Sequence, residues 1–275
     1  MNNDRLEKIL LYIFLTALLI LWIAPFFIVI LTALRTQNDL LTNGVFSIPE
    51  NIIFDNILNA WNKGNMSTYY RNSIVLTLLK VPTGVIIASL VAFPLAKWKF
   101  KFKEPLFILF LIGLAVPIHV TLLPNTITLS KLNLLNTLPG LFFPYIAFGL
   151  PMQILILRGF FSTIPNAFLE AAYIDGASEF IVYRRIMLPL AKPAIAALVI
   201  MDFLATWNEF TMALIFIHSE QWKTVPLGLM GLQGQFSSNY PTVMAATLVA
   251  IIPVILIYIL LQRFFVTGLG GGIKG

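Results

Sequence analysis

The sequence predicts an all-α polytopic membrane protein with six transmembrane helices, on three observations. Hydrophobic residues make up 59% of the 275 residues and charged residues only 11%, whereas globular domains carry about 25% charged residues. Six apolar segments are each long enough to cross a bilayer, which takes about 20 residues in a helix. The stretches between them are shorter than about 40 residues, below the usual size of a separate domain. We therefore expect one transmembrane domain over residues 1–275.

Each segment is justified by its freedom from charge. The first runs from Lys8 to Arg35 without a charged residue, which is longer than the apolar core of a signal peptide, and no small-residue cleavage site follows it. The others contain at most two charges that are not at an end. The six expected spans are 9–34, 72–96, 105–125, 138–158, 193–217 and 242–262.

The distribution of Lys and Arg predicts the orientation of the chain. With the N-terminus inside, the inner segments hold twelve basic residues and the outer segments five. The run 97–103 alternates four lysines with aromatic residues in a short loop that is hard to translocate. We therefore expect both termini and residues 162–192 to lie on the cytoplasmic side of a bacterial or archaeal cell membrane.

Composition also excludes several classes of function. The absence of cysteine rules out disulfides and thiolate sites. The net charge of +6 has no soluble basic face to carry it, so we expect no nucleic-acid partner. The sequence has no phosphate-binding glycine loop ending in Gly-Lys-Ser/Thr, no metal-ligand pattern and no set of catalytic residues. We expect no catalytic residue, metal or cofactor in this chain.

The polar island at 162–192 begins with the pattern of a short helix. One amphipathic stripe is formed by Ile164, Ala167, Phe168, Ala171 and Ile174. Ser162 or Thr163 can cap this helix, and Pro165 is tolerated in a first turn. Gly176 is expected to end it in the left-handed conformation.

A second short helix follows in the island. Ser178 can cap it, Glu179 lies near its positive end, and Arg184 and Arg185 lie near its negative end. Pro189 is expected to end the helix and to turn the chain back into the membrane.

The composition of the island favours a protein partner over a lipid surface. Ala171 and Ala172 leave room for another surface, and Glu170 offers a carboxylate to a basic partner. Interfacial lipid-binding helices are usually rich in Lys and Arg, whereas residues 163–180 carry three acidic and no basic side chains.

The island resembles the coupling loop of bacterial ABC-importer permeases, with the pattern E-A-A-x3-G-x9-I-x-L-P. The fixed positions are Glu170, Ala171, Ala172, Gly176, Ile186, Leu188 and Pro189. The likeness extends over almost the whole chain, to the carbohydrate branch of these permeases. It includes Phe46–Pro49, Tyr69–Ser73, Ile174–Ala177, Leu188–Pro193, Trp207–Phe210 and an ending, Gly268–Gly275, similar to that of the MalG-type subunit of maltose-like importers.

The resemblance implies partners and contacts. It implies a second, MalF-like permease subunit, two ATPase subunits that hold ATP and Mg²⁺, and an extracytoplasmic solute-binding protein. It also implies that the seven fixed positions of the island couple to the ATPase. The tail residues Gly271, Gly272 and Lys274 would contact the ATPase as well, although the tail read alone favours a disordered end.

Charged and polar residues within the spans mark a tentative substrate pathway. Lys80 and Glu209 are each eight residues from the outer end of their spans, so we expect them to pair or to share one aqueous pathway. Asp202 is seven residues before Glu209, on the same face of a continuous helix. The Trp207 indole can stack on a sugar ring, and the Asn208 amide can hydrogen-bond a sugar hydroxyl. Outward snorkelling of Lys80 and interfacial anchoring by Trp207 remain open.

The sequence therefore predicts the permease subunit of a binding-protein-dependent, ATP-driven importer, for a sugar or oligosaccharide. A polyol or glycerol phosphate remains an alternative substrate. A self-sufficient secondary transporter is the rival from another class, but we detect no inverted repeat in the sequence. An intramembrane enzyme would need a catalytic set that the sequence lacks.

Overall fold

A computed structural model describes residues 3–235 and 239–270, and this part of the chain is mostly helical and contains no strands. The longer helices are α1 (Asn3–Ala33), α4 (Met66–Lys97), α5 (Lys103–Ala115), α6 (Ile118–Lys131), α7 (Leu138–Thr163), α11 (Lys192–Trp207), α13 (Val225–Gln235) and α14 (Tyr240–Gly270). The shorter elements are α2 (Gln37–Asn43), α3 (Asp55–Asn62), α8 (Ala167–Ile174), α9 (Glu179–Val182), the π-helical turn η1 (Tyr183–Met187), α10 (Leu188–Leu190), α12 (Thr211–Phe216) and the 3₁₀ turn η2 (Glu220–Trp222).

The predicted all-α, membrane-spanning class is confirmed, whereas the count of six spans remains a prediction. In the described ranges, five helical segments are long and apolar enough to cross a membrane, and a bent pair of helices is a sixth candidate. The five segments are Arg5–Ala33, Met66–Lys97, Leu138–Thr163, Lys192–Phe216 and Tyr240–Gln262.

The third expected span is broken, which corrects the prediction of one helix over 105–125. Helices α5 and α6 meet at an angle of 95°. Val116 at the break is extended, with φ −82° and ψ 113°. The reason lies in Pro117, because a proline forces the preceding residue away from helical angles and supplies no N–H of its own.

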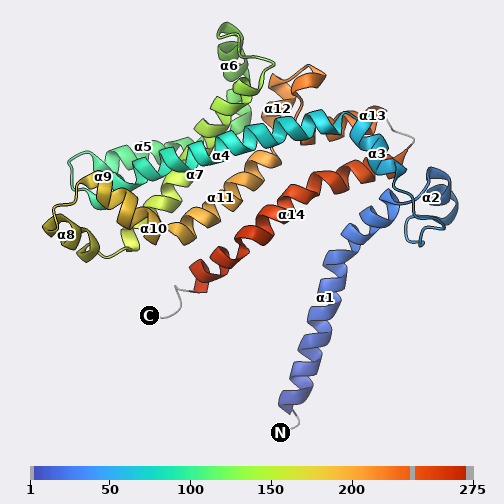
Figure 1. The fold of residues 1–275 in the computed structure, drawn as a ribbon, viewed down its shortest axis with the longest axis horizontal. Coiled ribbons are helices and arrows are strands. Elements are labelled where there is room, and N and C mark those ends of the chain that lie inside the picture. Colours follow the sequence, from blue (N-terminus) through green and yellow to red (C-terminus); the bar gives the residue numbers. More distant parts are fainter. Residues whose placement is uncertain (1–2, 236–238, 271–275) are drawn as a thin grey trace. The chain divides into compact units, whose positions relative to one another are not determined.

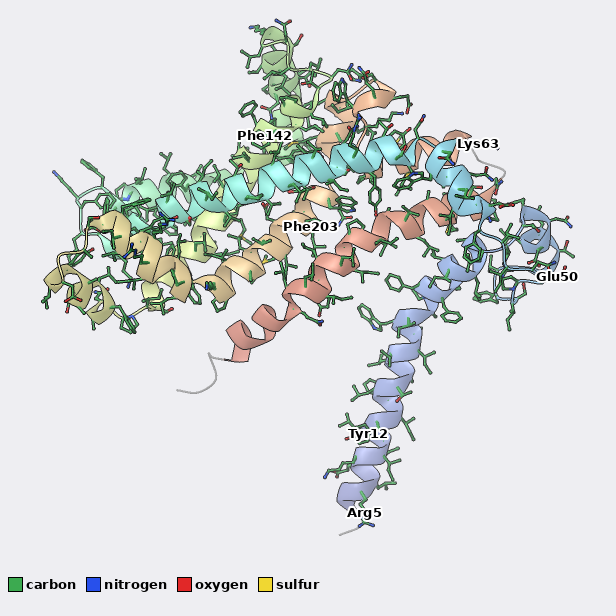
Figure 2. The ribbon with its side chains drawn as sticks, in the orientation of Figure 1. Arg5, Tyr12, Glu50, Lys63, Phe142 and Phe203 are labelled. Atoms are coloured by element: carbon green, nitrogen blue, oxygen red, sulfur yellow. The ribbon has the colours of Figure 1, made fainter. Side chains whose placement is uncertain are left out.

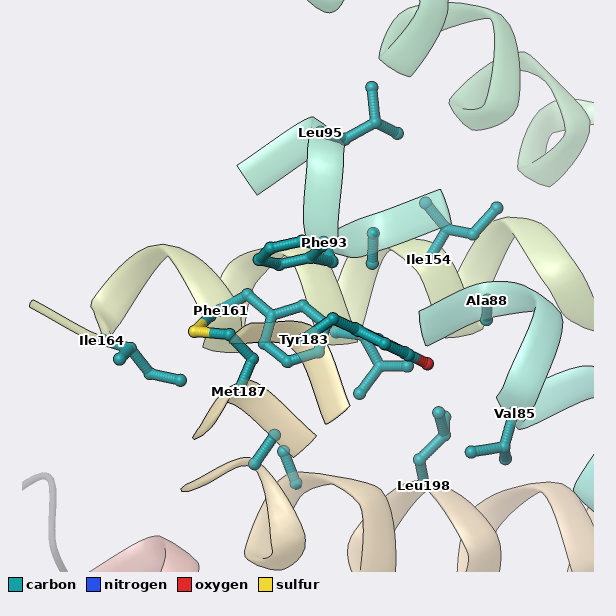
Figure 3. Close-up of a cluster of buried hydrophobic side chains, with 14 of the residues drawn as sticks. Val85, Ala88, Phe93, Leu95, Ile154, Phe161, Ile164, Tyr183, Met187 and Leu198 are labelled. Carbon is teal, nitrogen blue, oxygen red and sulfur yellow. The ribbon is translucent and has the colours of Figure 1, made fainter. Parts of the chain in front are cut away.

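The described chain forms two compact units, one with residues up to Ser67 and Gly228–Ile252, the other with Thr68–Leu227 and residues from Pro253 on. In the second unit, α4, α7 and α11 run along one another (Figure 1). Their shared core contains Phe93 of α4, Phe161 of α7 and Leu198 of α11, each at most 4% exposed. Figure 3 shows that Tyr183 and Met187 of η1 insert into the same core.

One cationic side chain joins three helices of the second unit. Arg158 of α7 donates to the carbonyl of Leu95 at 3.1 Å and pairs with Glu104 of α5 at 2.5 Å. Its guanidinium also lies 3.7 Å from the ring centroid of Phe107. These contacts fix the ends of α4, α5 and α7 together.

The first unit is organised around a buried arginine. Arg35, just after α1, is fully buried and donates to the carbonyls of Leu31, Gly44 and Ser47. Helix α1 itself is exposed along most of its length, and its side chains project freely, as Tyr12 does in Figure 2. An apolar helix that is hydrophobic on all sides is suited to lipid or to a membrane-embedded partner.

Candidate functional site

A buried ion pair connects α4 and α11. The Lys80 ammonium pairs with Oδ1 of Asp202, and the two residues are 2% and 6% exposed. The second oxygen of Asp202, Oδ2, is buried without a hydrogen-bond partner among the described residues. Charges within membrane helices usually face a bundle interior or a cavity, and outward snorkelling of Lys80 does not fit this burial.

The expected pairing of Lys80 with Glu209 is wrong. That prediction assumed one continuous helix through Glu209, but α11 ends at Trp207 and the chain turns before α12. Glu209 therefore leaves the face that it would share with Asp202. Its carboxylate instead accepts hydrogen bonds from the Tyr145 hydroxyl and from two backbone N–H groups.

Those N–H groups belong to Met212 and Ala213, in the first turn of α12. They lie 2.7 and 3.2 Å from the Glu209 carboxylate. The first N–H groups of a helix have no partner within the helix, and the positive end of its dipole favours a carboxylate. The break in the span thus creates the place that holds Glu209.

A cavity of about 170 Å³ brings the three charges together. Lys80, Asp202 and Glu209 all line it, together with Tyr145 and Thr206. The remaining lining residues are Ile118, Phe148, Gly149, Ala205 and Met212. The shared lining agrees with the expectation of one common pathway, whose role in transport remains a prediction.

Two of the predicted pathway residues do not line this cavity. Trp207 is 3% exposed, with its ring edge-on to Tyr70 at 5.5 Å and stacked on Phe203 at 5.7 Å. The Asn208 amide donates to the carbonyl of Leu204 at 3.0 Å. In this conformation neither side chain is presented to a ligand in the cavity.

The sequence reasoning missed residues of α7. Tyr145 lines the cavity, and Gln153 lies on the same helix outside the lining, with a buried amide that has no partner in the described part of the chain. A Cβ on Gly149 would lie 3.0 Å from Lys80 Nζ and 3.1 Å from Gln153 Nε2, so this glycine makes room for both. A polar glutamine within an apolar span is costly, and this could have drawn attention to the helix.

The polar island forms a second candidate site, and its first helix differs from the prediction. Ser162 and Thr163 do not cap it, because they end α7 and donate back to the carbonyls of Arg158 and Phe160. Helix α8 starts at Ala167 without a side-chain cap. The left-handed stop is confirmed at Gly176, with φ +77°.

The stripe expected on α8 is mostly exposed. Phe168 is 49% and Ile174 86% exposed, whereas Leu169 and Ala172 pack into the core. Of the stripe, Ile164 alone is buried. The apolar face is thus free for a partner, and Glu170 and Ala171 are exposed beside it.

The second part of the island continues further than predicted. The helix passes from α9 through η1 into α10, and Pro189 lies in the first turn of α10 rather than ending a helix. The chain turns at Ala191, before α11. Ile186 and Leu188 are half-buried and pack against the core, so this part of the island is held against the spans.

Hydrogen bonds tie the island to the last residue of α4 and to the loop that follows it. Lys97 donates to the Ile164 carbonyl and to Asn166. One carboxylate oxygen of Glu179 accepts from the Trp98 indole at 3.0 Å and from the Tyr173 hydroxyl at 2.9 Å. Burial and the bond to Glu179 raise the pKa of Tyr173 to about 12.

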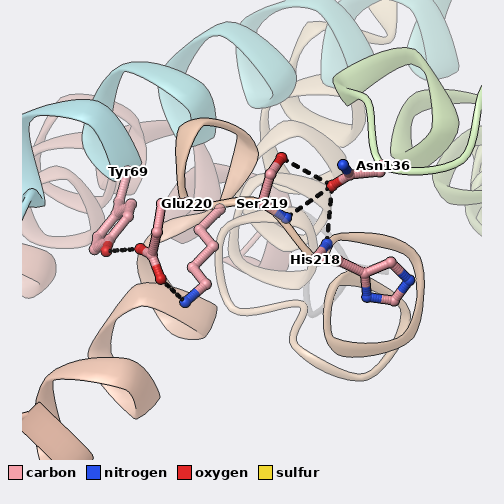
Figure 4. Close-up of polar contacts among 6 residues, drawn as sticks. Tyr69, Asn136, His218, Ser219 and Glu220 are labelled. Atoms are coloured by element: carbon pink, nitrogen blue, oxygen red, sulfur yellow. Dashed lines mark hydrogen bonds and ion pairs between the residues drawn. The ribbon is translucent and has the colours of Figure 1, made fainter.

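The opposite end of the second unit carries an ordered loop around η2. Figure 4 shows that the Asn136 side-chain oxygen accepts from the backbone N–H groups of His218 and Ser219, both at 2.9 Å. Glu220 accepts from the Tyr69 hydroxyl at 2.5 Å and pairs with Lys223. The loop is thereby fixed to the start of α4. The predicted tail contacts, Gly271, Gly272 and Lys274, lie outside the described residues.

Comparisons with known proteins agree with these features. Residues 81–269 match the family described as "Binding-protein-dependent transport system inner membrane component". The chain is 36% identical to a putative ABC transporter permease, ORF2, of Caldicellulosiruptor sp., over 96% of both chains. It is 33% identical to the arabinooligosaccharides transport system permease AraQ of Bacillus subtilis, over 98% of this chain and 96% of the relative.

A solved structure shares the fold. It is that of a bacterial ABC transporter involved in the import of the acidic polysaccharide alginate, with a TM-score of 0.83, 22% identity and coverage of 96% of this chain and 98% of the other. The chain therefore belongs to the family of binding-protein-dependent transport system inner membrane components, and it is the permease subunit of an ABC importer rather than an enzyme.

Proposed function

We propose that this permease imports a carbohydrate by alternating access, and that the cavity beside Lys80, Asp202 and Glu209 is part of the substrate pathway. The family relationship supports this proposal, since the related AraQ is named for arabinooligosaccharide transport. The single observation that carries the pathway is the cavity itself, with two carboxylates and an ammonium inside a membrane span. Such groups are costly within a membrane, and they often mark substrate or ion pathways.

The second part of the proposal concerns energy supply. The island would dock onto two ATPase subunits on the cytoplasmic side, and its seven fixed positions would couple the two parts. Glu170, Ala171, Gly176 and Pro189 are exposed to a partner, whereas Ala172, Ile186 and Leu188 pack the island against the spans. ATP and Mg²⁺ would be held by the ATPase subunits, and the tail around Gly271, Gly272 and Lys274 would add contacts. The exposed apolar residues of α8 support docking, because they lie outside the candidate spans.

The buried contacts between the island and the spans explain how docking can act on the cavity. Tyr183 and Met187 are buried among residues of α4, α7 and α11, and the Tyr183 hydroxyl hydrogen-bonds Ser89 of α4 at 2.6 Å. Close-packed interiors transmit displacements rather than absorb them. A push on α8 is therefore expected to move the helices that carry Lys80 and Asp202.

The remaining partners follow from the assignment of the chain as a permease subunit. A second, MalF-like permease subunit would complete the pathway, and an extracytoplasmic binding protein would deliver the substrate. The exposed apolar surface of α1 is suited to lipid or to that second subunit. The protein would lie in the cell membrane with both termini and the island in the cytoplasm, and the loop around η2 outside.

Reconstitution of the complete importer in proteoliposomes tests the proposal. The assay measures uptake of radiolabelled neutral oligosaccharides, including arabino-oligosaccharides, with ATP on the ATPase side. We expect uptake only when ATP, both permeases, the ATPase and the binding protein are all present. Uptake by this chain alone, without ATP, would establish a secondary transporter instead.

A further inference from the structure

The charges that line the cavity do not balance. Of its ten lining residues, three are charged: Lys80, Asp202 and Glu209. The ammonium of Lys80 is offset by Asp202, and in the described part of the chain Glu209 has no ion-pair partner. The wall that this chain supplies therefore carries a net negative charge.

The two hydroxyl donors of the wall are committed, and the Lys80 ammonium makes one hydrogen bond, to Asp202. The hydroxyl of Tyr145 donates to Glu209, and that of Thr206 donates to the carbonyl of Asp202 at 2.7 Å. Both hydroxyl oxygens are left as acceptors. Three donors already converge on the Glu209 carboxylate, an arrangement that suits an ionised, acceptor-only group.

A buried oxygen beside the cavity still lacks a partner. Oδ2 of Asp202, a residue only 6% exposed, has no hydrogen bond among the described residues. A buried acceptor without a donor is costly, and native proteins usually satisfy it with protein groups, water or a ligand. An acceptor-rich, negatively charged wall thus calls for a ligand that brings donors and no negative charge.

We propose that this cavity selects neutral, polyhydroxylated solutes and disfavours anionic ones such as uronic acids and phosphorylated sugars. The inference rests on the proposed function in that the cavity is taken to lie on the substrate pathway. Sugar hydroxyls can donate to Asp202 and Glu209, whereas a carboxylate or phosphate adds only acceptors and like charge. Like charges brought together across a contact are strongly disfavoured.

The selectivity would separate this permease from its structural relative. The solved transporter of the same fold is involved in the import of an acidic polysaccharide. At 22% identity the shared fold does not determine the lining of the cavity. We therefore expect the substrate class to differ between the two transporters through the residues that line their cavities, while the fold is shared.

A cysteine reporter measures the electrostatic potential without knowledge of the substrate. The chain contains no cysteine, so Ala205→Cys places one thiol in the lining of the cavity. In the complete importer, its reaction rates with a cationic and an anionic methanethiosulfonate of similar size are compared. Each rate is normalised to the rate of the same reagent with a free thiol.

We expect the cationic reagent to react about fivefold faster than the anionic one, or more. One fixed negative charge about 8 Å from the thiol has this effect on the ratio of the two rates even at the dielectric constant of water. Glu209→Gln in the reporter background should bring the ratio close to one. Asp55→Asn, which removes an exposed carboxylate outside the cavity, should leave it unchanged. In the Ala205→Cys importer without a second substitution, a higher salt concentration should lower the ratio of the two rates. This measurement tests the inference even if the Glu209→Gln variant does not assemble.

A ratio near or below one in the reporter, or no reaction with either reagent, would overturn the inference. Failure of the proposed function has a different outcome, namely absence of ATP-dependent uptake of any oligosaccharide by the reconstituted importer. A cationic preference without uptake would retain the negative cavity and reject the transport role. Uptake without a cationic preference would retain the transport role and reject the negative cavity.

Discussion

The indole N–H of Trp98 donates a 3.0 Å hydrogen bond to the carboxylate of Glu179, and this contact joins the loop after α4 to the second helix of the island. The same oxygen accepts from Tyr173 at the end of α8. One carboxylate thus holds three separate segments in register. All three residues are exposed, so the contact contributes more to the position of the island than to the stability of the fold.

The first prediction concerns a substitution that removes this indole N–H. Trp98→Phe keeps an aromatic ring near Phe93 but leaves Glu179 without one donor. We expect the free energy of unfolding to fall by about 1 kcal/mol or less, while more ATP is hydrolysed per solute imported. Uptake and ATPase activity of the same proteoliposomes give this ratio. Trp22→Phe, at a 74% exposed position on α1, is the matched control and should leave the ratio unchanged.

The second prediction concerns the buried ion pair. Lys80→Met leaves Asp202 as an unpaired buried charge, and loss of one partner of a buried pair costs about 3–5 kcal/mol. We expect a lower thermal unfolding temperature of the purified complex, and substantial recovery when Asp202→Leu is added. Lys63→Met, at an exposed position, should have little effect.

Charge exchange identifies the partner of Lys80. Lys80→Asp with Asp202→Lys should recover stability that either change alone removes, because it restores a pair across the same two helices. Lys80→Glu with Glu209→Lys should not recover it, because Glu209 is bonded to Tyr145 and to the start of α12. Rescue by the second exchange and not by the first would contradict the observed pairing.

The third prediction tests the island as the coupling element. Glu170→Lys reverses an exposed charge outside the candidate spans, so insertion should be normal while the ATPase co-purifies less. Gly176→Leu places a side chain at φ +77°, which is strained for an L-residue by about 1–2 kcal/mol although the space around it is open. We expect loss of substrate-stimulated ATP hydrolysis.

Gly159→Leu is the matched control, since it also has open space but sits in α7 without a positive φ. Retained ATPase binding and normal transport in the Glu170→Lys, Gly176→Leu double variant would show that coupling runs elsewhere.

The fourth prediction tests the orientation. Single cysteines at Asn51 and Ser178, both exposed, should react with an impermeant maleimide from opposite sides of sealed vesicles. Position 51 should be labelled from outside and position 178 only after permeabilisation. Labelling of both from one side would contradict the proposed topology, in which the island is cytoplasmic.

The fifth prediction is a pH dependence of the loop around η2. Hydrogen bonds from Lys223 and Tyr69 lower the pKa of Glu220 below its usual value of 4.5. A lowered pKa in the folded state means that the contribution of Glu220 is present above about pH 4.5 and is lost as the pH falls through the folded value. Hydrogen exchange of the His218 and Ser219 amides, corrected for intrinsic rates, should therefore accelerate only under acidic conditions. Glu220→Gln should abolish this acid step, and a step that persists would assign it to another group.

The membrane class, the approximate spans and the family were all predictable from local features of the sequence. Apolar segments of about 20 residues specify spans wherever they occur, because the bilayer leaves a backbone no alternative to internal hydrogen bonding. The left-handed stop at Gly176 was predictable for a similar local reason, since glycine alone adopts that conformation without strain. The fixed positions from Glu170 to Pro189 carried the family likeness.

Tertiary structure decided the partners of the polar residues. Depth along a straight helix suggested that Lys80 would pair with Glu209, but the end of α11 at Trp207 rotated Glu209 away and left Asp202 opposite the lysine. Tyr145 became the partner of Glu209 through the packing of α7. Contacts between helices depend on the packing of side chains that are distant in sequence, and a local pattern does not encode that packing.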